Sequence, residues 1–265
     1  MYPTQHASSA PLLSLQGVTW STGGRQILGP LSFSVEEGEW VAVIGPNGAG
    51  KTSLLRLLTG IRSPAEGGLF FGEDSYQSLQ ARELALRIAY VPQVRPSRLP
   101  LLVEDLVLQG RFPHLSRWQL APSEEDFQAV SQALETVELE AFRQRPVNEL
   151  SGGERQAVFI AAALAQKAPV LMLDEPTTHL DPRHQRDIVK LLQRLRRNHR
   201  PTVVLATHDL RLAARSDRVL ALSGGGILAF DEPKRVLRPE VLEGLFSTPF
   251  DIVQLEDGVA PLVKF

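Results

Sequence analysis

The stretch that decides the fold is Gly45-Pro46-Asn47-Gly48-Ala49-Gly50-Lys51-Thr52. It fits the pattern G-x-x-x-x-G-K-[ST], in which glycines let backbone N–H groups approach a phosphate closely. The apolar run Trp40–Ile44 before it predicts a buried strand, and Ser53–Leu58 after it predicts the start of a helix. A strand, a glycine turn and a helix N-terminus together predict a phosphate-binding loop, because the helix dipole adds positive charge at that point.

Two side chains of this loop are expected to act on the phosphates. Lys51 would neutralise the β- and γ-phosphates, and the Thr52 hydroxyl would bind Mg²⁺. The nucleotide-binding residues predicted in this segment are Gly45, Pro46, Asn47, Gly48, Ala49, Gly50, Lys51, Thr52 and Ser53.

A second motif, Leu150-Ser151-Gly152-Gly153-Glu154, precedes the apolar helical run 157–165. Ser151 is a good N-cap, and the two glycines leave the first-turn N–H groups exposed. Alone, this motif also fits a linker or an ordinary cap. A phosphate-binding loop followed by LSGGE, in this order, resembles the ATP-binding cassette (ABC) ATPase family over about 12–246. The resemblance implies that Ser151, Gly152, Gly153 and Glu154 bind the nucleotide held by a second copy.

The strand-like run Val170–Leu173 ends in two carboxylates, Asp174 and Glu175. An acid at the carboxyl end of a buried parallel strand points into the ligand crevice. Asp174 is therefore expected to hold Mg²⁺, and Glu175 to orient and deprotonate an attacking water, as phosphoryl transfer requires. The alternative interpretation is a pair of solvated acids that cap a strand.

The resemblance assigns roles to three further residues. His208 corresponds to the family's switch histidine, which contacts the γ-phosphate and holds Glu175 and the water in place. Gln93, in Tyr90-Val91-Pro92-Gln93, matches the glutamine that touches Mg²⁺ or the water. Asp181 matches the loop that reaches across the dimer interface. The predicted catalytic residues are Glu175, His208 and Gln93, and the predicted Mg²⁺ ligands are Thr52, Asp174 and Gln93.

This sequence departs from the family pattern at the residue that stacks on adenine. Thr22 stands where the family usually has an aromatic residue, and Trp20 lies two residues earlier. Since residues two apart share one face of a strand, Trp20 could stack on the base, or it could pack in the core.

The order of elements predicts the fold class and the domain boundaries. Strand patterns alternate with helix patterns on either side of a helical insert, which favours a mainly parallel sheet with right-handed crossovers. With the resemblance, we expect an α/β P-loop NTPase (RecA-like) core, an antiparallel β region and a helical subdomain. The expected boundaries are a loose tail at 1–10, one ABC ATPase domain at 11–247 with the helical subdomain at about 93–166, and a C-terminal extension at 248–265.

Composition excludes several classes of function. The net charge is −2, the sequence pI is about 6.3, and no basic field indicates nucleic acid as a partner. The absence of cysteine excludes disulfides and thiolate metal sites. No apolar stretch is long enough to span a bilayer and the start of the chain does not fit a secretory signal, so a membrane role would come through a partner.

The segments Gln109–His114 and Pro176–Asp181 look like those of ATPase subunits of importers for ferric siderophores, haem and cobalamin. That resemblance implies ATP and Mg²⁺ as ligands and a head-to-tail dimer of the chain. It also implies an integral membrane permease, an indirect periplasmic or extracellular substrate-binding protein, and a peripheral location on the cytoplasmic face of the cell (inner) membrane. A ferric siderophore or haem is the expected cargo, with cobalamin or another metal chelate as the alternative. A soluble non-transport ABC ATPase, an exporter subunit and a non-catalytic nucleotide-binding module remain further alternatives.

Overall fold

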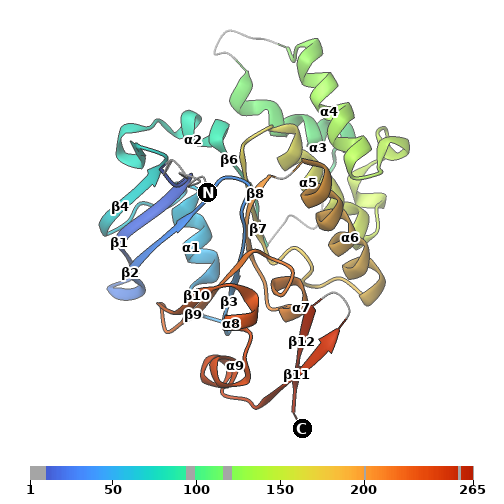
Figure 1. Ribbon diagram of the computed structural model, residues 1–265. Coiled ribbons are helices and arrows are strands. Elements are labelled where there is room, and N and C mark those ends of the chain that lie inside the picture. The colour runs from blue at the N-terminus through green and yellow to red at the C-terminus, as the bar shows by residue number, and fades with distance from the viewer. Residues whose placement is uncertain (1–9, 94–98, 116–120, 200, 256–257, 265) are drawn as a thin grey trace, which may run out of the picture.

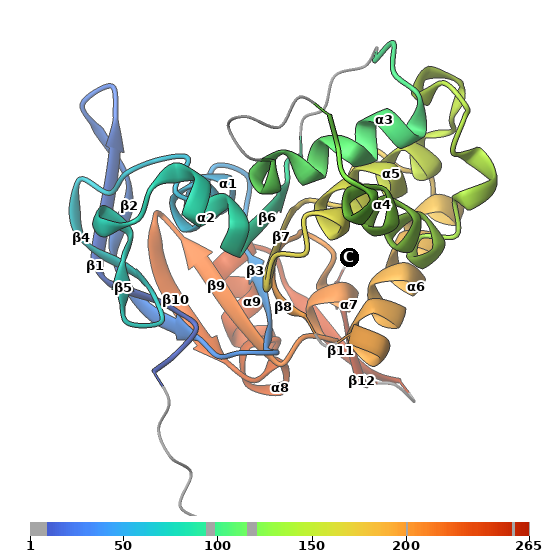
Figure 2. The same ribbon diagram turned by 90° about the horizontal axis from the view of Figure 1, so that it is seen from above.

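The computed structural model describes residues 10–93, 99–115, 121–199, 201–255 and 258–264. The expected loose tail therefore lies almost entirely outside the described residues. Helices cover both faces of a central sheet, and a second sheet stands on one side of it (Figures 1 and 2). The strands are β1 Leu13–Thr22, β2 Arg25–Val35, β3 Trp40–Ile44, β4 Glu66–Phe71, β5 Asp74–Ser75, β6 Ile88–Val91, β7 Val170–Asp174, β8 Thr202–Ala206, β9 Arg218–Ser223, β10 Gly226–Asp231, β11 Phe250–Leu255 and β12 Gly258–Val263.

The helices lie mainly between these strands in sequence. They are α1 Lys51–Leu58, α2 Ala81–Arg87, α3 Val103–Leu108, α4 Glu124–Thr136, α5 Gly152–Ala165, α6 Pro182–His199, α7 Leu210–Ala213, α8 Pro233–Val236 and α9 Pro239–Phe246. Short 3₁₀ helices lie at Tyr76–Ser78, Gln109–His114, Glu140–Phe142 and Val147–Glu149.

The central sheet has the strand order β10-β9-β3-β8-β7-β6 in the described chain. β9, β3, β8, β7 and β6 run parallel, and β10 joins the edge antiparallel through the turn at Gly224 and Gly225. The parallel strands therefore end at one edge, which gathers the residues that follow β3, β7 and β8.

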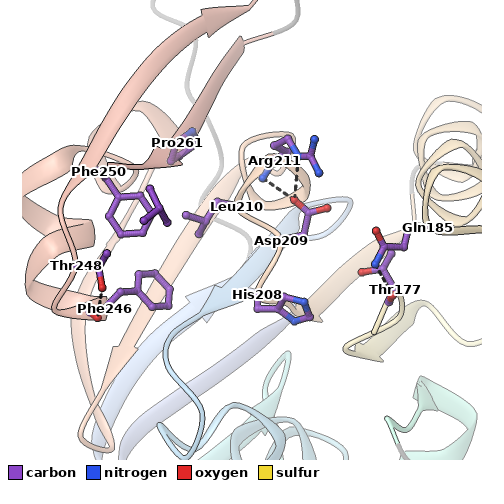
Figure 3. Close-up of a pocket in the computed structure, with 11 residues that line it drawn as sticks. Thr177, Gln185, His208, Asp209, Leu210, Arg211, Phe246, Thr248, Phe250 and Pro261 are labelled. Atoms are coloured by element: carbon purple, nitrogen blue, oxygen red, sulfur yellow. Dashed lines mark hydrogen bonds and ion pairs between the residues drawn. The ribbon is translucent and has the colours of Figure 1, made fainter. Parts of the chain in front are cut away.

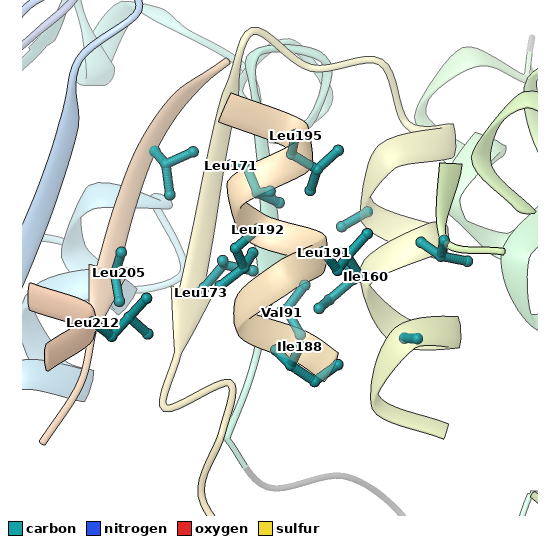
Figure 4. Close-up of a cluster of buried hydrophobic side chains, with 14 of the residues drawn as sticks. Val91, Ile160, Leu171, Leu173, Ile188, Leu191, Leu192, Leu195, Leu205 and Leu212 are labelled. Carbon is teal, nitrogen blue, oxygen red and sulfur yellow. The ribbon is translucent and has the colours of Figure 1, made fainter. Parts of the chain in front are cut away.

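Alternating residues of the central strands pack into two separate hydrophobic cores, one on each face of the sheet. Val41 and Val43 pack with α1 and the antiparallel sheet β2-β1-β4-β5, whereas Ala42 and Ile44 belong to the core on the opposite face. On that opposite face, α6 packs Ile188, Leu191, Leu192 and Leu195 between the sheet and α5 (Figure 4). Burial on both faces explains why these strands read as continuous apolar runs.

The helical segment has a buried ion pair at its centre. Arg111 donates from Nε to Asp126 Oδ1 at 2.8 Å and from Nη1 to the Ala165 carbonyl at 2.9 Å. Ser123 caps α4 and also donates to Asp126. Burial opposes ionisation of Asp126, but the bonds from Arg111 and Ser123 outweigh it and lower its pKa to about 2. The pair thus ties the 3₁₀ segment Gln109–His114 to α4 and α5.

Some elements differ from the sequence expectations. The sequence pattern predicts a strand only over Leu31–Val35, but β2 begins at Arg25, because its first half pairs with the end of β1. α2 was not predicted, since Ala81–Arg87 is short and its apolar pattern is weak. The sequence pattern predicts a helix over 210–215, whereas α7 ends at Ala213. The C-terminal extension forms the hairpin β11–β12, for which the boundary prediction named no secondary structure. Across the described residues, no helix combines the length and the apolar character that crossing a membrane needs.

Candidate functional site

The glycine loop between β3 and α1 surrounds a cavity of about 360 Å³. Gly45 and Gly50 have φ of 155° and 103°. A Cβ on Gly45 would lie 2.3 Å from the Leu222 carbonyl oxygen, and one on Gly50 would lie 2.5 Å from Leu28 Cδ2. The loop can therefore take this path only with glycine at both positions. The cavity is lined by Ile27, Asn47, Gly48, Ala49, Gly50, Lys51, Thr52, Ser53, Gln93 and Glu175.

Lys51 is a buried cation at the first position of α1. Its Nζ donates to the carbonyl oxygens of Gly45 at 2.9 Å and Pro46 at 3.4 Å, and lies 3.5 Å from Glu175 Oε1. Gly45 and Pro46 thus bind the lysine through their carbonyl oxygens and do not line the cavity. A cation in this position, beside the N-terminus of a helix, is suited to bind anionic oxygen atoms.

Asp174, the last residue of β7, is held by two hydroxyl groups. Thr52 Oγ1 donates to Oδ1 and Tyr90 OH donates to Oδ2, both at 3.1 Å. Burial raises the pKa of Asp174 despite these bonds, and burial together with the nearby Asp174 charge raises the pKa of Tyr90 to about 12. The oxygen donors at Thr52 and Asp174, with Gln93 on the same cavity, are of the type that Mg²⁺ prefers.

Glu175 follows Asp174 and is joined to His208 from the next strand. Glu175 has φ of 51°, and its N–H donates to the Ala206 carbonyl at 2.9 Å. Its Oε2 lies 2.6 Å from His208 Nδ1 and accepts a hydrogen bond from Thr178 Oγ1 at 3.0 Å. The buried carboxylate therefore faces the cavity with one oxygen near Lys51 and the other held by His208 and Thr178.

The second motif lies outside this cavity. Ser151 caps α5, and Glu154 accepts a hydrogen bond from the Ser151 N–H at 2.8 Å, which lowers the pKa of Glu154. A Cβ on Gly153 would lie 2.3 Å from His184 Cδ2, so the motif packs against the start of α6.

Asp181 shares that neighbourhood. It accepts the N–H groups of Arg183 and His184, each at 3.0 Å, and its Oδ2 lies 2.6 Å from His184 Nδ1. The backbone N–H of His184 lowers the pKa of Asp181. Neither Asp181 nor any of Ser151, Gly152, Gly153 and Glu154 lines the cavity. The predicted site residues thus form two separate surfaces within one chain.

Sequence reasoning missed three residues at this site. Tyr90 and Thr178 stood inside quoted motifs, but only the pairing of β6 with β7 and the turn after Glu175 bring their hydroxyls to the carboxylates. Ile27 lines the cavity on β2, a part of the strand that was not predicted. Trp20 packs against the core between the two sheets and does not line the cavity.

Comparison with known proteins gives one matching family and close relatives. Residues 28–178 match the family model described as "ABC transporter". The chain is 36% identical to the petrobactin import ATP-binding protein FpuC of Bacillus anthracis, over 92% of this chain and 89% of FpuC. It is 35% identical to the iron(3+)-hydroxamate import ATP-binding protein FhuC of Bacillus subtilis, over 91% of this chain and 90% of FhuC.

Solved structures with the same fold include a whole transporter and an isolated cassette. An inward-facing putative metal-chelate type ABC transporter superposes with a TM-score of 0.82 and 30% identity, covering 96% of this chain and 98% of that one. The cassette MJ0796, described as a dimer in a post-hydrolysis state bound to ADP and Pi, gives a TM-score of 0.70 and 30% identity, covering 83% and 98%.

Proposed function

The chain belongs to the ABC transporter family as an ATP-binding subunit and ATPase, and from this premise we propose how its residues hydrolyse ATP and what the hydrolysis drives. The observation that carries the proposal is the buried pair of Lys51 and Glu175 at the phosphate-binding loop, with the exposed His208 joined to Glu175, together with the separation of Ser151 from that loop.

The loop N–H groups and Lys51 bind the β- and γ-phosphates. Glu175 takes a proton from a water that attacks the γ-phosphorus, while the bond from that phosphorus to the bridging oxygen breaks and leaves ADP and phosphate. His208 and Thr178 hold the Glu175 carboxylate for this task. Thr52, Asp174 and Gln93 would hold Mg²⁺, which supplies charge neutralisation of the phosphate oxygens.

Two copies pair head to tail, so that Ser151 and Asp181 of one copy complete the nucleotide site of the other. The separation of these residues from their own cavity supports this arrangement, and so does the dimeric state described for MJ0796. To change such a pair from mostly open to mostly closed, ATP must bind the closed form better by about 5.5 kcal/mol. Several charge-assisted hydrogen bonds to each γ-phosphate are sufficient for this.

The dimer drives import of an iron complex, a ferric siderophore or haem, through a separate membrane permease. The importer FhuC at 35% identity and the metal-chelate transporter at 30% support this cargo class. Phe112 supports a partner at the helical segment, because it is 77% exposed while its neighbours are fixed by Arg111 and by the Arg82 bond to the Pro113 carbonyl at 2.8 Å. The chain then lies on the cytoplasmic face of the membrane, bound through the permease, and a periplasmic or extracellular binding protein delivers the cargo.

Glu175→Gln tests the catalytic part of the proposal. The variant keeps ATP binding, loses turnover by at least about a hundredfold, and sediments as a dimer at saturating ATP and Mg²⁺. A monomeric variant under these conditions would contradict the sandwich.

A matched pair of serine variants tests the role of the second motif. Ser151 and Ser123 both cap a helix within a capping box, so alanine at either site costs about 1 kcal/mol of helix stability. Only Ser151→Ala is expected to lower turnover. An equal loss of turnover in both variants would mean that Ser151 affects turnover only through helix stability.

Cargo and partner are tested in native membranes. A tagged chain recovered by gentle pull-down brings a many-span permease with it, and transport of ferric siderophore, haem and cobalamin is then compared in vesicles that contain the complex. Transport of cobalamin alone would mean that cobalamin, rather than an iron complex, is the cargo. Recovery of soluble partners only would contradict the role in transport.

A further inference from the structure

The two acids at the end of β7 are held from opposite neighbours in the central sheet. The strand order β8-β7-β6 places one strand on each side of Asp174 and Glu175. His208, which follows β8, contacts Glu175, and Tyr90 of β6 contacts Asp174. Tyr90 is therefore placed on Asp174 much as His208 is placed on Glu175.

The support of Glu175 on the β8 side is open to solvent. Figure 3 shows His208 among the residues that line a second hollow, of about 540 Å³. The hairpin β11–β12 contributes Phe250 and Val263 to this hollow, which shares none of its lining residues with the nucleotide cavity. Since the side chain of His208 is 55% exposed, Glu175 is held on this side by a group that solvent reaches.

The support of Asp174 lies inside the protein. Tyr90 is paired with Met172 in the register of β6 and β7. Because side chains alternate along a strand, Tyr90, Met172 and Asp174 share one face of the sheet. Tyr90 packs there against the core that includes α1, the helix that carries Thr52. Two different elements therefore bring a hydroxyl group to Asp174, whose exposure is only 1%.

The two hydroxyl groups bind different oxygens of the Asp174 carboxylate. Thr52 Oγ1 donates to Oδ1 and Tyr90 OH donates to Oδ2, both at 3.1 Å. Thr52 lines the nucleotide cavity and Tyr90 does not, so Oδ1 is the oxygen joined to the cavity lining. The terminal torsion of an aspartate has a broad energy minimum, so the side chain alone does not fix the rotation of the carboxylate. The bond from Tyr90 to Oδ2 supplies that restraint.

We propose that Tyr90 is a positioning residue for the Mg²⁺ site, because it holds the Asp174 carboxylate in the rotation that keeps Oδ1 beside Thr52. The inference rests on the proposed function, in which Thr52, Asp174 and Gln93 would hold Mg²⁺. Carboxylate ligands are commonly fixed by a hydrogen bond from a residue that does not touch the metal, and loss of such a partner costs about 10–100-fold in metal affinity or activity. Tyr90 also lies three residues before Gln93, so the strand that restrains Asp174 leads directly to another expected ligand.

The test measures how much Mg²⁺ tightens the binding of a fluorescent ADP analogue, as the ratio of its affinities in Mg²⁺ and in EDTA. ADP is used because it lacks the γ-phosphate, so neither hydrolysis nor the proposed ATP-bridged dimer affects the measurement. Tyr90→Phe should keep the affinity in EDTA close to that of the natural chain, because Tyr90 does not line the cavity. The same variant should lower the ratio at least about fivefold.

Tyr76→Phe is the matched control. Tyr76 donates its hydroxyl to the Leu58 carbonyl at 2.7 Å, at the opposite end of α1 from Thr52. Both variants therefore lose one hydrogen bond from a tyrosine hydroxyl, but only Tyr90→Phe should lower the effect of Mg²⁺. An equal decrease in both variants, or a decrease of less than about fivefold in Tyr90→Phe, would overturn the inference.

Asp174→Asn distinguishes this failure from a failure of the proposed function. If Mg²⁺ tightens ADP binding in Asp174→Asn as in the natural chain, the proposed metal site itself is wrong. If Asp174→Asn loses the effect of Mg²⁺ and Tyr90→Phe keeps it, the metal site stands and only the role of Tyr90 is overturned.

ATP turnover gives a second readout that a loss of stability would not reproduce. Tyr90→Phe should need a higher Mg²⁺ concentration for half-maximal turnover and should approach the natural kcat at saturating Mg²⁺. A lower kcat with an unchanged half-saturating Mg²⁺ concentration would contradict the positioning role.

Discussion

Asp126→Ala is expected to lower the free energy of unfolding through the buried ion pair with Arg111. Both residues are buried, Arg111 at 2% exposure and Asp126 at 3%. In the variant, the remaining partners of the Arg111 guanidinium are the Ala165 carbonyl and, at 3.8 Å, the exposed Glu125 carboxylate. It also removes the acceptor of both hydrogen bonds from Ser123.

The magnitude follows from the cost of an unpaired buried charge. Removing one partner of a buried pair costs about 3–5 kcal/mol, whereas replacing both partners with apolar residues of similar volume is close to neutral. Asp126→Ala should therefore be destabilised by about 3–5 kcal/mol, and Arg111→Met/Asp126→Leu by far less.

The pH dependence gives a second, independent measure. The Asp126 pKa of about 2 lies below its usual 3.8, a shift that corresponds to about 2 kcal/mol. A lowered pKa stabilises the fold above the unfolded-state value, and this contribution is lost as pH falls through about 2. The stability difference between the natural chain and Asp126→Asn should thus be constant above about pH 5 and shrink toward pH 2.

The assay is urea unfolding followed by circular dichroism, at pH 7 and at several acidic values. A loss under about 1 kcal/mol for Asp126→Ala would refute the reasoning from buried charge, which requires several times more. A stability difference that does not change with pH would refute the assignment of a lowered pKa.

Three further predictions concern the site and its support. Lys51→Met should lose ATP affinity at least about tenfold, because it removes the cation that the proposed function places at the phosphates. Unchanged affinity in a nucleotide titration would contradict this. Trp20→Ala should reduce stability by about 1–3 kcal/mol without changing the ratio of ATP to GTP turnover, since the partly buried Trp20 packs against the core and Ile27 lines the cavity. A strong ATP preference lost in the variant would assign the stacking to Trp20. Gly110→Ala should unfold the helical segment at a lower urea concentration, because the new Cβ would lie 1.9 Å from the Ala162 carbonyl oxygen; Gly244→Ala, whose Cβ would meet nothing within 4 Å, is the control.

The fold class and most catalytic candidates could be predicted because their signals are local. The phosphate-binding loop needs glycine at fixed positions, a lysine at the helix start and an apolar strand before it, and all of these lie within 40–58. Continuous apolar runs gave the central strands, since a parallel sheet buries both of its faces. Short or half-exposed elements such as α2 and the first half of β2 carried no such signal.

The partners of each side chain depended on strand order instead. Glu175 and His208 are 33 residues apart and meet because β7 and β8 are neighbours, and Tyr90 reaches Asp174 because β6 lies on the other side of β7. Arg111 finds Asp126 and the end of α5 only when the helices pack together.

The sequence by itself determined the family, the phosphate-binding loop and the two acids at the end of β7, because contiguous residues encode a backbone path and the charges on it. Only the tertiary structure decided which groups hold those acids, how far Ser151 lies from its own nucleotide cavity, and that the C-terminal hairpin stands beside His208. These features arise from side-chain packing between segments distant in the chain, and no local pattern of residue types specifies which of many possible contacts such packing selects.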